Sequence, residues 1–269
     1  MIHLRGISLA RPETLPAAFP FNVPAIATLD ALEFTSEVTF FVGENGSGKS
    51  TLLETIACAA QLPTIGSDQV DSDPTLAAVR HLSNHLRWSW TRRTRRGLFM
   101  RSEDFFGYAK RIAQTRHDLR ADVDAVQSEY SGRSLLAQQL AEMPLRRELH
   151  ALEQSYGDGL DAQSHGESYF KLFRSRFVPN GLYLLDEPEA PLSPMRQLAL
   201  LAMLKQMIDQ GAQFIIATHS PIILAYPGAT IYSFDDGRIH PSDYEALEHV
   251  TITRTFLNNP DAYLRHLLE

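Results

Sequence analysis

The most constraining feature of this sequence is the glycine-rich segment GENGSGKST at 43–51, which directly follows an apolar run at 38–42. Its spacing is G-x-x-x-x-G-K-S, with Gly43, Gly48, Lys49 and Ser50 at the fixed positions. Glycines there allow a tight loop whose backbone N–H groups point inward at an anion. A helix that begins at the end of the loop adds the positive end of its dipole. The segment therefore predicts a strand, a phosphate-binding loop and a helix.

The residues of this loop suit the binding of a nucleoside triphosphate. The lysine reaches the β- and γ-phosphates, and the hydroxyl of Ser50 ligates Mg²⁺. The alternative is a strand-to-helix turn without a ligand, which the spacing and context disfavour. The expected ATP contacts are Gly43, Glu44, Asn45, Gly46, Ser47, Gly48, Lys49, Ser50 and Thr51.

Composition narrows the class of protein. The chain has 269 residues, 44% of them hydrophobic, which is enough for one sizeable α/β domain with a subdomain inserted in it. The formal net charge of −7 makes any nucleic-acid site a local patch. A single cysteine excludes an intrachain disulfide framework. No apolar run approaches the roughly 18 residues of a membrane span, so we expect a cytoplasmic protein without direct membrane insertion.

Two further apolar runs end in polar residues that suit catalysis. The run that begins at Gly181 ends in Asp186 and Glu187, and the buried strand expected at 213–218 has His219 at its end. Because parallel strands bring their carboxyl ends to one edge of a sheet, we expect these residues at the phosphate loop. There Asp186 would hold Mg²⁺, Glu187 would activate the attacking water, and His219 would contact the γ-phosphate or that water. The alternatives are a surface acid pair and a structural histidine.

A basic and aromatic segment, HLRWSWTRRTRRGLFM, occupies 85–100. Alternation on either side of TRRTRR predicts a β-hairpin with the arginines at its tip. Arginines beside Trp88 and Trp90 suit nucleic-acid backbones and bases. The alternative is a solvated tip, or arginines paired with the chain's own carboxylates. The candidate nucleic-acid contacts are Arg92, Arg93, Arg95 and Arg96.

The rest of the chain predicts alternating helices and strands. Apolar residues at helical spacing predict a helical subdomain at approximately 104–160, inserted in a single domain of residues 1–269. A first strand is expected within 2–9, and a hairpin within 230–240. One helix is expected to begin at Pro194, and the helical stretch at 252–268 is expected to be interrupted at Pro260.

Together these motifs resemble the ATPase domain of ABC-type proteins, a branch of the P-loop NTPases. GENGSGKS resembles the Walker A motif, GLYLLDEP resembles the Walker B motif with its catalytic glutamate, and ATHS resembles the switch-histidine segment. SHGES resembles the ABC signature, usually LSGGQ, although His165 replaces its first glycine and Glu167 its glutamine. The glutamine expected before the helical subdomain is absent, and Ser102 or Glu103 stands in its place.

The resemblance implies an α/β ABC-ATPase fold with a mainly parallel core sheet, an antiparallel β portion and an inserted helical subdomain. It also implies Mg²⁺-dependent ATP hydrolysis in a homodimer that sandwiches ATP head to tail. The signature residues would then act on the nucleotide of the partner: Ser164, His165, Gly166 and Glu167.

More narrowly, the chain resembles stand-alone soluble bacterial ATPases labelled "predicted ATPase" or AAA-family ATPase, related to the SMC and recombination-repair branch. Three uses of the ATP cycle remain open. The first is work on DNA or on a DNA-processing partner. The alternatives are a transporter's nucleotide-binding subunit and an ATP-dependent switch that binds a protein partner.

Overall fold

The computed structural model describes residues 1–10, 16–65, 73–156 and 165–267. It divides into two compact units, the first formed by 1–102 and 178–269 and the second by 103–177. The second unit spans the segment 104–160, which the sequence predicts to be a helical insertion, and continues to residue 177.

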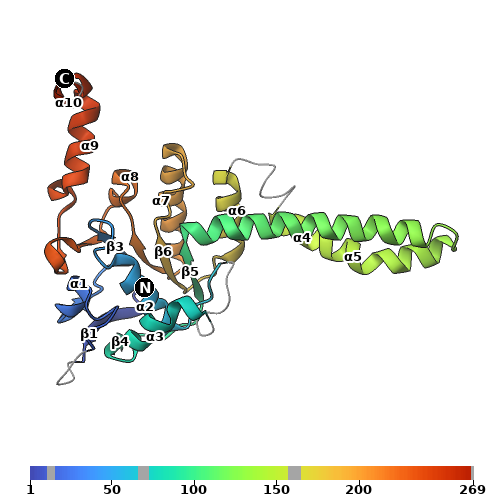
Figure 1. Cartoon of the computed structure of the whole chain (residues 1–269), viewed down its shortest axis with the longest axis horizontal. Helices are drawn as coiled ribbons and strands as arrows, with labels where there is room; N and C mark the ends of the chain where they lie inside the picture. The colour runs from blue at the N-terminus through green and yellow to red at the C-terminus, as the bar shows by residue number, and fades with distance from the viewer. Residues whose placement is uncertain (11–15, 66–72, 157–164, 268–269) are drawn as a thin grey trace. The chain divides into compact units, whose positions relative to one another are not determined.

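The first unit is built on a six-stranded sheet of order β5-β6-β7-β3-β8-β9 (Figure 1). The first five strands are parallel, and the last pairs antiparallel with β8. Every residue of β3, β6 and β7 is buried, which explains their nearly continuous apolar sequences. The bounds are β3 (Val38–Val42), β5 (Gly97–Arg101), β6 (Leu182–Asp186), β7 (Gln213–Ala217), β8 (Thr230–Ser233) and β9 (His240–Pro241). The expected parallel core is thus confirmed.

A second, antiparallel sheet has the order β2-β1-β4, formed by β1 (Leu4–Leu9), β2 (Ala31–Glu33) and β4 (Leu86–Trp90). Because β4 and β5 lie in different sheets, the predicted hairpin at 85–100 is wrong. Alternation shows only that a strand has one buried face, and it does not specify the partner strand. The arginine-rich residues 91–96 form the crossover between the two sheets.

Two helix boundaries of the first unit lie where the sequence predicts them. Ser193 precedes a helix that starts at Pro194, and the C-terminal helices are separated just before Pro260. The helices are α1 (Pro24–Ala27), α2 (Lys49–Ala60), α3 (Ala77–Ser83), α7 (Pro194–Asp209), α8 (Pro221–Leu224), α9 (Glu248–Asn258) and α10 (Pro260–Leu267). Single 3₁₀ turns occur at η1 (Pro74–Leu76), η2 (Asp235–Gly237) and η3 (Tyr244–Ala246).

The described residues of the second unit are mainly helical. The unit contains most of α4 (Ser102–Glu129), all of α5 (Leu135–Tyr156) and α6 (His165–Arg176). Helices α4 and α5 run antiparallel beside each other (Figure 1), and an Arg120–Glu153 ion pair of 3.0 Å links them. Within the described residues, no helix is both long enough and apolar enough to span a bilayer.

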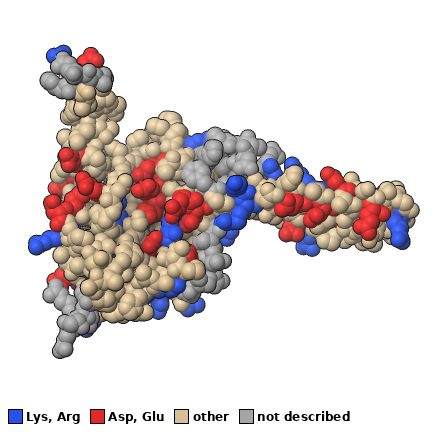
Figure 2. All heavy atoms as spheres, viewed as in Figure 1, with Lys and Arg blue, Asp and Glu red and all other residues tan. Residues whose placement is uncertain are grey.

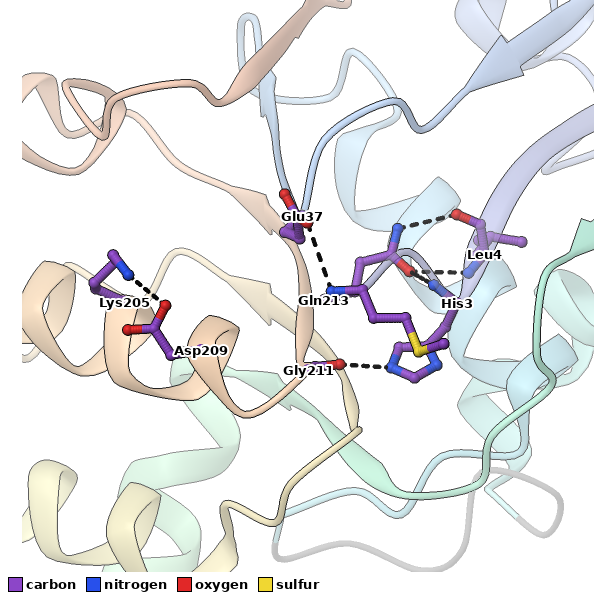
Figure 3. A network of polar contacts seen from close by, with 8 residues as sticks. His3, Leu4, Glu37, Lys205, Asp209, Gly211 and Gln213 are labelled. Atoms are coloured by element: carbon purple, nitrogen blue, oxygen red, sulfur yellow. Dashed lines mark hydrogen bonds and ion pairs between the residues drawn. The ribbon is translucent and has the colours of Figure 1, made fainter.

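The side chain of one fully buried glutamine links the two sheets of the first unit by hydrogen bonds (Figure 3). Gln213 opens β7, and its Oε1 accepts hydrogen bonds from the backbone N–H groups of His3 (2.8 Å) and Leu4 (2.9 Å). Its Nε2 donates to the carbonyl of Leu4 at 3.0 Å. The ring Nε2 of His3 donates to the carbonyl of Gly211 at 2.9 Å. These bonds satisfy buried backbone groups at the start of β1.

Surface charge agrees with the net charge of −7. Figure 2 shows acidic side chains gathered on the part of the first unit from which α9 rises. Along α4 and α5, acidic and basic side chains are mixed. The face in view therefore offers no broad basic surface for a polyanion.

Candidate nucleotide-binding site

Parallel strands bring several candidate residues to one edge of the central sheet. The register places Arg101, Asp186 and Ala217 side by side at the ends of β5, β6 and β7. Strand β3 pairs with β7 and β8 and ends directly before the phosphate loop. The predicted convergence of the phosphate loop, the acid pair and His219 therefore follows from the sheet order.

The phosphate loop turns through glycines in the left-handed region. Gly43 has a φ of 136° and Gly48 a φ of 108°. A Cβ on Gly48 would lie 2.8 Å from Cγ1 of Val23, and one on Gly43 would lie 3.0 Å from Oδ1 of Asp235. Both positions thus require glycine. Because α2 begins at Lys49, its N-terminus faces the loop and favours an anion there.

Lys49 is buried inside this loop. Its Nζ donates to the carbonyls of Gly43 (2.6 Å) and Glu44 (2.8 Å). Burial lowers the pKa of Lys49, and the charges of Asp186 and Glu187 oppose that shift. An ammonium group held by loop carbonyls is placed to exchange them for phosphate oxygens.

Asp186 ends β6 with its carboxylate buried. Burial raises the pKa of Asp186 to about 6, although a hydrogen bond from the Ser50 side chain lowers it. Its Oδ1 has no hydrogen-bond partner in the described part of the chain. The structure thus brings the two predicted Mg²⁺ ligands together, and a hydroxyl beside a carboxylate fits that hard cation.

Glu187 leaves the strand in a left-handed conformation, with a φ of 50°. Its N–H donates to the carbonyl of Ala217 at 2.9 Å, and its side chain is exposed at the sheet edge. The hydroxyl of Ser102 donates to the carbonyls of Asp186 (3.1 Å) and Glu187. Ser102, one of the two residues considered for the position of the missing glutamine, therefore fixes the backbone that carries both acids.

His219 follows β7, as predicted. Its N–H donates to Oε1 of Glu189 at 2.7 Å, while its ring Nε2 has no partner among the described residues. Burial lowers the pKa of His219 and raises that of Glu189. Sequence reasoning missed Glu189, although an acid two residues after the pair Asp186 and Glu187 was a usable signal.

Two more residues that sequence reasoning missed lie on the other side of the loop. Asp235 accepts through Oδ1 from the N–H of Glu44 (3.1 Å) and through Oδ2 from the hydroxyl of Ser233 (2.7 Å). His249 belongs to α9, and its ring centroid lies 6.3 Å from that of His219. Its Nε2 is also buried without a partner in the described ranges. No local motif marks His249.

A cavity of about 930 Å³ opens beside the phosphate loop. Residues 43–47, His219, Asp235 and His249 line it, and its volume suits a nucleoside triphosphate. Phe21 does not belong to the described lining of this cavity; it is buried, and its ring centroid lies 5.0 Å from that of His85.

The remaining candidates lie elsewhere. The described lining of the nucleotide cavity includes none of the four arginines, which lie on the crossover between β4 and β5. All four arginines are exposed, and Arg93 in addition donates through Nη2 to the carbonyl of Ala59 at 2.9 Å. Of the signature, Ser164 lies outside the described residues. His165, Gly166 and Glu167 begin α6 in the second unit.

A family model described as ABC transporter matches residues 32–190. The match covers more than half of the chain and includes both the phosphate loop and the acid pair. The chain belongs to the ABC transporter family of ATPases. Its core fold and its ATPase chemistry are those that the Walker motifs predict.

Curated relatives of this ABC ATPase include transporter proteins. The ribose import ATP-binding protein RbsA 2 of Burkholderia cenocepacia is 24% identical over 79% of this chain and 39% of its own length. The macrolide export ATP-binding/permease protein MacB of Photorhabdus laumondii is 26% identical over 89% of this chain and 34% of its own length. The chain thus spans little more than a third of these relatives.

Solved structures that resemble this chain include a transporter subunit and an Smc head domain. One is cbiO1 from Clostridium perfringens, part of the ABC transporter complex cbiONQ, with a TM-score of 0.48 and 16% identity over 100% of this chain and 99% of that one. Another is the Smc head domain from Pyrococcus furiosus, with a TM-score of 0.45 and 13% identity over 95% of this chain and 100% of that one.

Proposed function

We propose that this chain binds Mg²⁺ and ATP at the phosphate loop and hydrolyses the ATP between two copies arranged head to tail. The observation that carries the proposal is a group of buried polar atoms without partners in the described ranges: Ser47 Oγ, Asp186 Oδ1, His219 Nε2 and His249 Nε2. Buried polar atoms are normally hydrogen-bonded. Acceptors and donors left open around a phosphate loop support a ligand that combines phosphate with a cation.

Each group has a chemical role in this proposal. Lys49 binds phosphate oxygens, and Ser50 with Asp186 would hold Mg²⁺, which neutralises phosphate charge when bound. The exposed carboxylate of Glu187 orients the attacking water and accepts its proton. His219 donates through Nε2 to the γ-phosphate as charge builds up. Glu189 fixes the backbone of His219 and so positions its ring.

A second copy would complete the site. The start of α6 carries His165, Gly166 and Glu167, directly after Ser164. A helix N-terminus presents backbone N–H groups that favour an anion. We propose that these four residues contact the γ-phosphate held by the partner, which makes dimerisation dependent on ATP.

The process that ATP hydrolysis drives is a separate question. The family and the names of the relatives favour a role as the nucleotide-binding subunit of a transporter. This interpretation takes precedence over a stand-alone ATPase of the SMC and repair branch, for which the comparisons give no separate support. Affinity purification of the tagged Glu187→Gln chain with ATP from solubilised membranes tests it. Recovery of one membrane protein in fixed ratio is expected, and purification of the chain alone would contradict the transporter assignment.

The nucleotide site is tested by Lys49→Ala in calorimetry with Mg²⁺ and ATP. We expect loss of measurable binding, because the buried cation at the phosphates is removed. The matched control is Lys205→Ala, since Lys205 is exposed on α7 and pairs only with Asp209 among the described contacts. Unchanged ATP affinity in Lys49→Ala would overturn the assignment of the loop.

A further inference from the structure

A second hollow, of about 600 Å³, lies at the end of α2 opposite the phosphate loop. The end of α2, helix α3 and strand β4 line it. Because α2 has 12 residues and rises about 1.5 Å per residue, the two sites lie about 18 Å apart along the helix. The hollow is therefore separate from the nucleotide-binding site.

Two tryptophans form one wall of this hollow. Leu86, Trp88 and Trp90 alternate on one face of β4, where Leu86 is buried and both indoles are half-buried. The indoles are stacked, with centroids 6.3 Å apart and an interplanar angle of 26°. Trp88 donates through Nε1 to the carbonyl of Ser83 at 3.0 Å, which fixes its ring. An oriented, half-buried indole pair is a platform on which a planar ring stacks.

Arg93 makes the rim of the hollow positive. One of its N–H groups donates to the carbonyl of Ala59, and a guanidinium has five such donors. The head group is thus held at the hollow and retains donors for a phosphate. No Asp or Glu belongs to the described lining, although the chain as a whole carries a net charge of −7. The lining also includes the amides of Gln61 and Asn84.

We propose that this hollow binds a nucleobase that carries a phosphate, as in a single-stranded nucleic acid. The base would stack on the indole wall formed by Trp88 and Trp90, and the phosphate would bind Arg93. Aromatic stacking beside an arginine is the chemistry of sequence-tolerant single-strand binding. Of the four arginines that the sequence suggests, only Arg93 lines the described hollow. The proposal does not depend on ATP, so its failure and that of the nucleotide-binding site are distinguishable.

The experiment exploits the fact that the chain contains only two tryptophans, both in this hollow. Intrinsic tryptophan fluorescence of the full chain, without ATP, is titrated at low salt with oligothymidylate and, separately, with thymidine monophosphate. We expect saturable quenching. Quenching by both at equal affinity per base identifies a free nucleotide as the ligand, and quenching by the strand alone identifies a nucleic acid. Quenching by neither overturns the proposal.

Variants locate the binding. Arg93→Gln should weaken the affinity about tenfold, the value of one charge-assisted hydrogen bond. Arg95→Gln is the matched control, because Arg95 is exposed on the same crossover and does not line the hollow. Trp90→Leu removes part of the wall and keeps Trp88 as the reporter, so it should also bind more weakly. Unchanged affinity in both Arg93→Gln and Trp90→Leu, or equal weakening in Arg95→Gln, overturns the proposal.

Discussion

At the scale of single residues, burial in the site disfavours the charged forms of several titratable side chains. Burial is the largest influence on Asp186, and it outweighs both the Ser50 hydrogen bond and the charge of Lys49. Burial likewise lowers the pKa values of His219 and His249, so both imidazoles favour the neutral form. A neutral imidazole retains an N–H donor for a phosphate without adding a fixed charge.

Asp186→Asn should stabilise the metal-free protein at pH 8. The pKa of Asp186 rises from 3.8 to about 6 on folding, so between these pH values the folded state binds more protons than the unfolded state. The free energy of unfolding therefore falls as the pH rises through this range. A shift of this size corresponds to a destabilisation of the folded state by about 3 kcal/mol. This destabilisation, which Asp186→Asn removes, is complete above the folded pKa and decreases as the pH falls toward 4. Thermal unfolding at pH 8 and pH 5 checks this, and an equal gain at both pH values contradicts it.

His249→Ala should lower ATP turnover about tenfold, because one donor to the phosphate region is lost. The measurement is steady-state phosphate release at saturating ATP and Mg²⁺. His117→Ala serves as the control, since His117 is exposed on α4 and belongs to the second unit. Turnover equal to that of the control would assign His249 a packing role only.

At the scale of elements, the start of β1 depends on a side chain from β7. The fully buried side chain of Gln213 accepts hydrogen bonds from two backbone N–H groups and donates one to a backbone carbonyl. No intrinsic strand preference of residues 3–4 supplies these bonds. The position of the antiparallel sheet against the parallel one is therefore fixed partly by one amide group.

Gln213→Leu should destabilise the fold by about 3 kcal/mol, because it leaves buried backbone groups of His3 and Leu4 without partners. Urea denaturation gives the free energy of unfolding. Gln206→Leu, at an exposed position of α7, should change it by less than about 0.5 kcal/mol. A similar small change in Gln213→Leu would show that other contacts hold the sheets together.

At the scale of the whole molecule, the proposed catalytic glutamate is exposed at an edge of the first unit. The signature residues that would close over the γ-phosphate belong to the second unit, at the start of α6. Pairing of two copies head to tail would bring each signature to the other copy's nucleotide. The dimer, rather than the single chain, is then the complete ATPase.

Glu187→Gln should form a dimer with Mg²⁺ and ATP, because bound ATP persists when its hydrolysis is blocked. Light scattering after gel filtration measures the mass. The same variant with ADP, and the double variant with Lys49→Ala and ATP, should remain monomeric. A monomer of Glu187→Gln at saturating ATP would contradict the head-to-tail homodimer.

The sequence by itself determined the features that depend on short stretches of chain. A phosphate loop requires glycines at fixed spacing, so Gly43, Gly48 and Lys49 identify it wherever the rest of the chain lies. Strands buried on both faces are nearly continuously apolar, which reveals β3, β6 and β7 and places Asp186 at the end of β6 and His219 just after β7. Pro194 predicts the start of α7, because proline is favoured in a first turn, and Pro260 predicts the break between α9 and α10.

Only the tertiary structure decided which distant segments meet. The alternating pattern of β4 and the apolar run of β5 are equally compatible with one hairpin and with two sheets, and long-range pairing with β1 and β6 selected the second. Asp235 and His249 reach the phosphate loop because β8 pairs with β3 and α9 follows that edge. Ser102 gains its role because β5 lies beside β6. Local sequence preferences do not predict such contacts, because the contacts form only when the sheets are assembled.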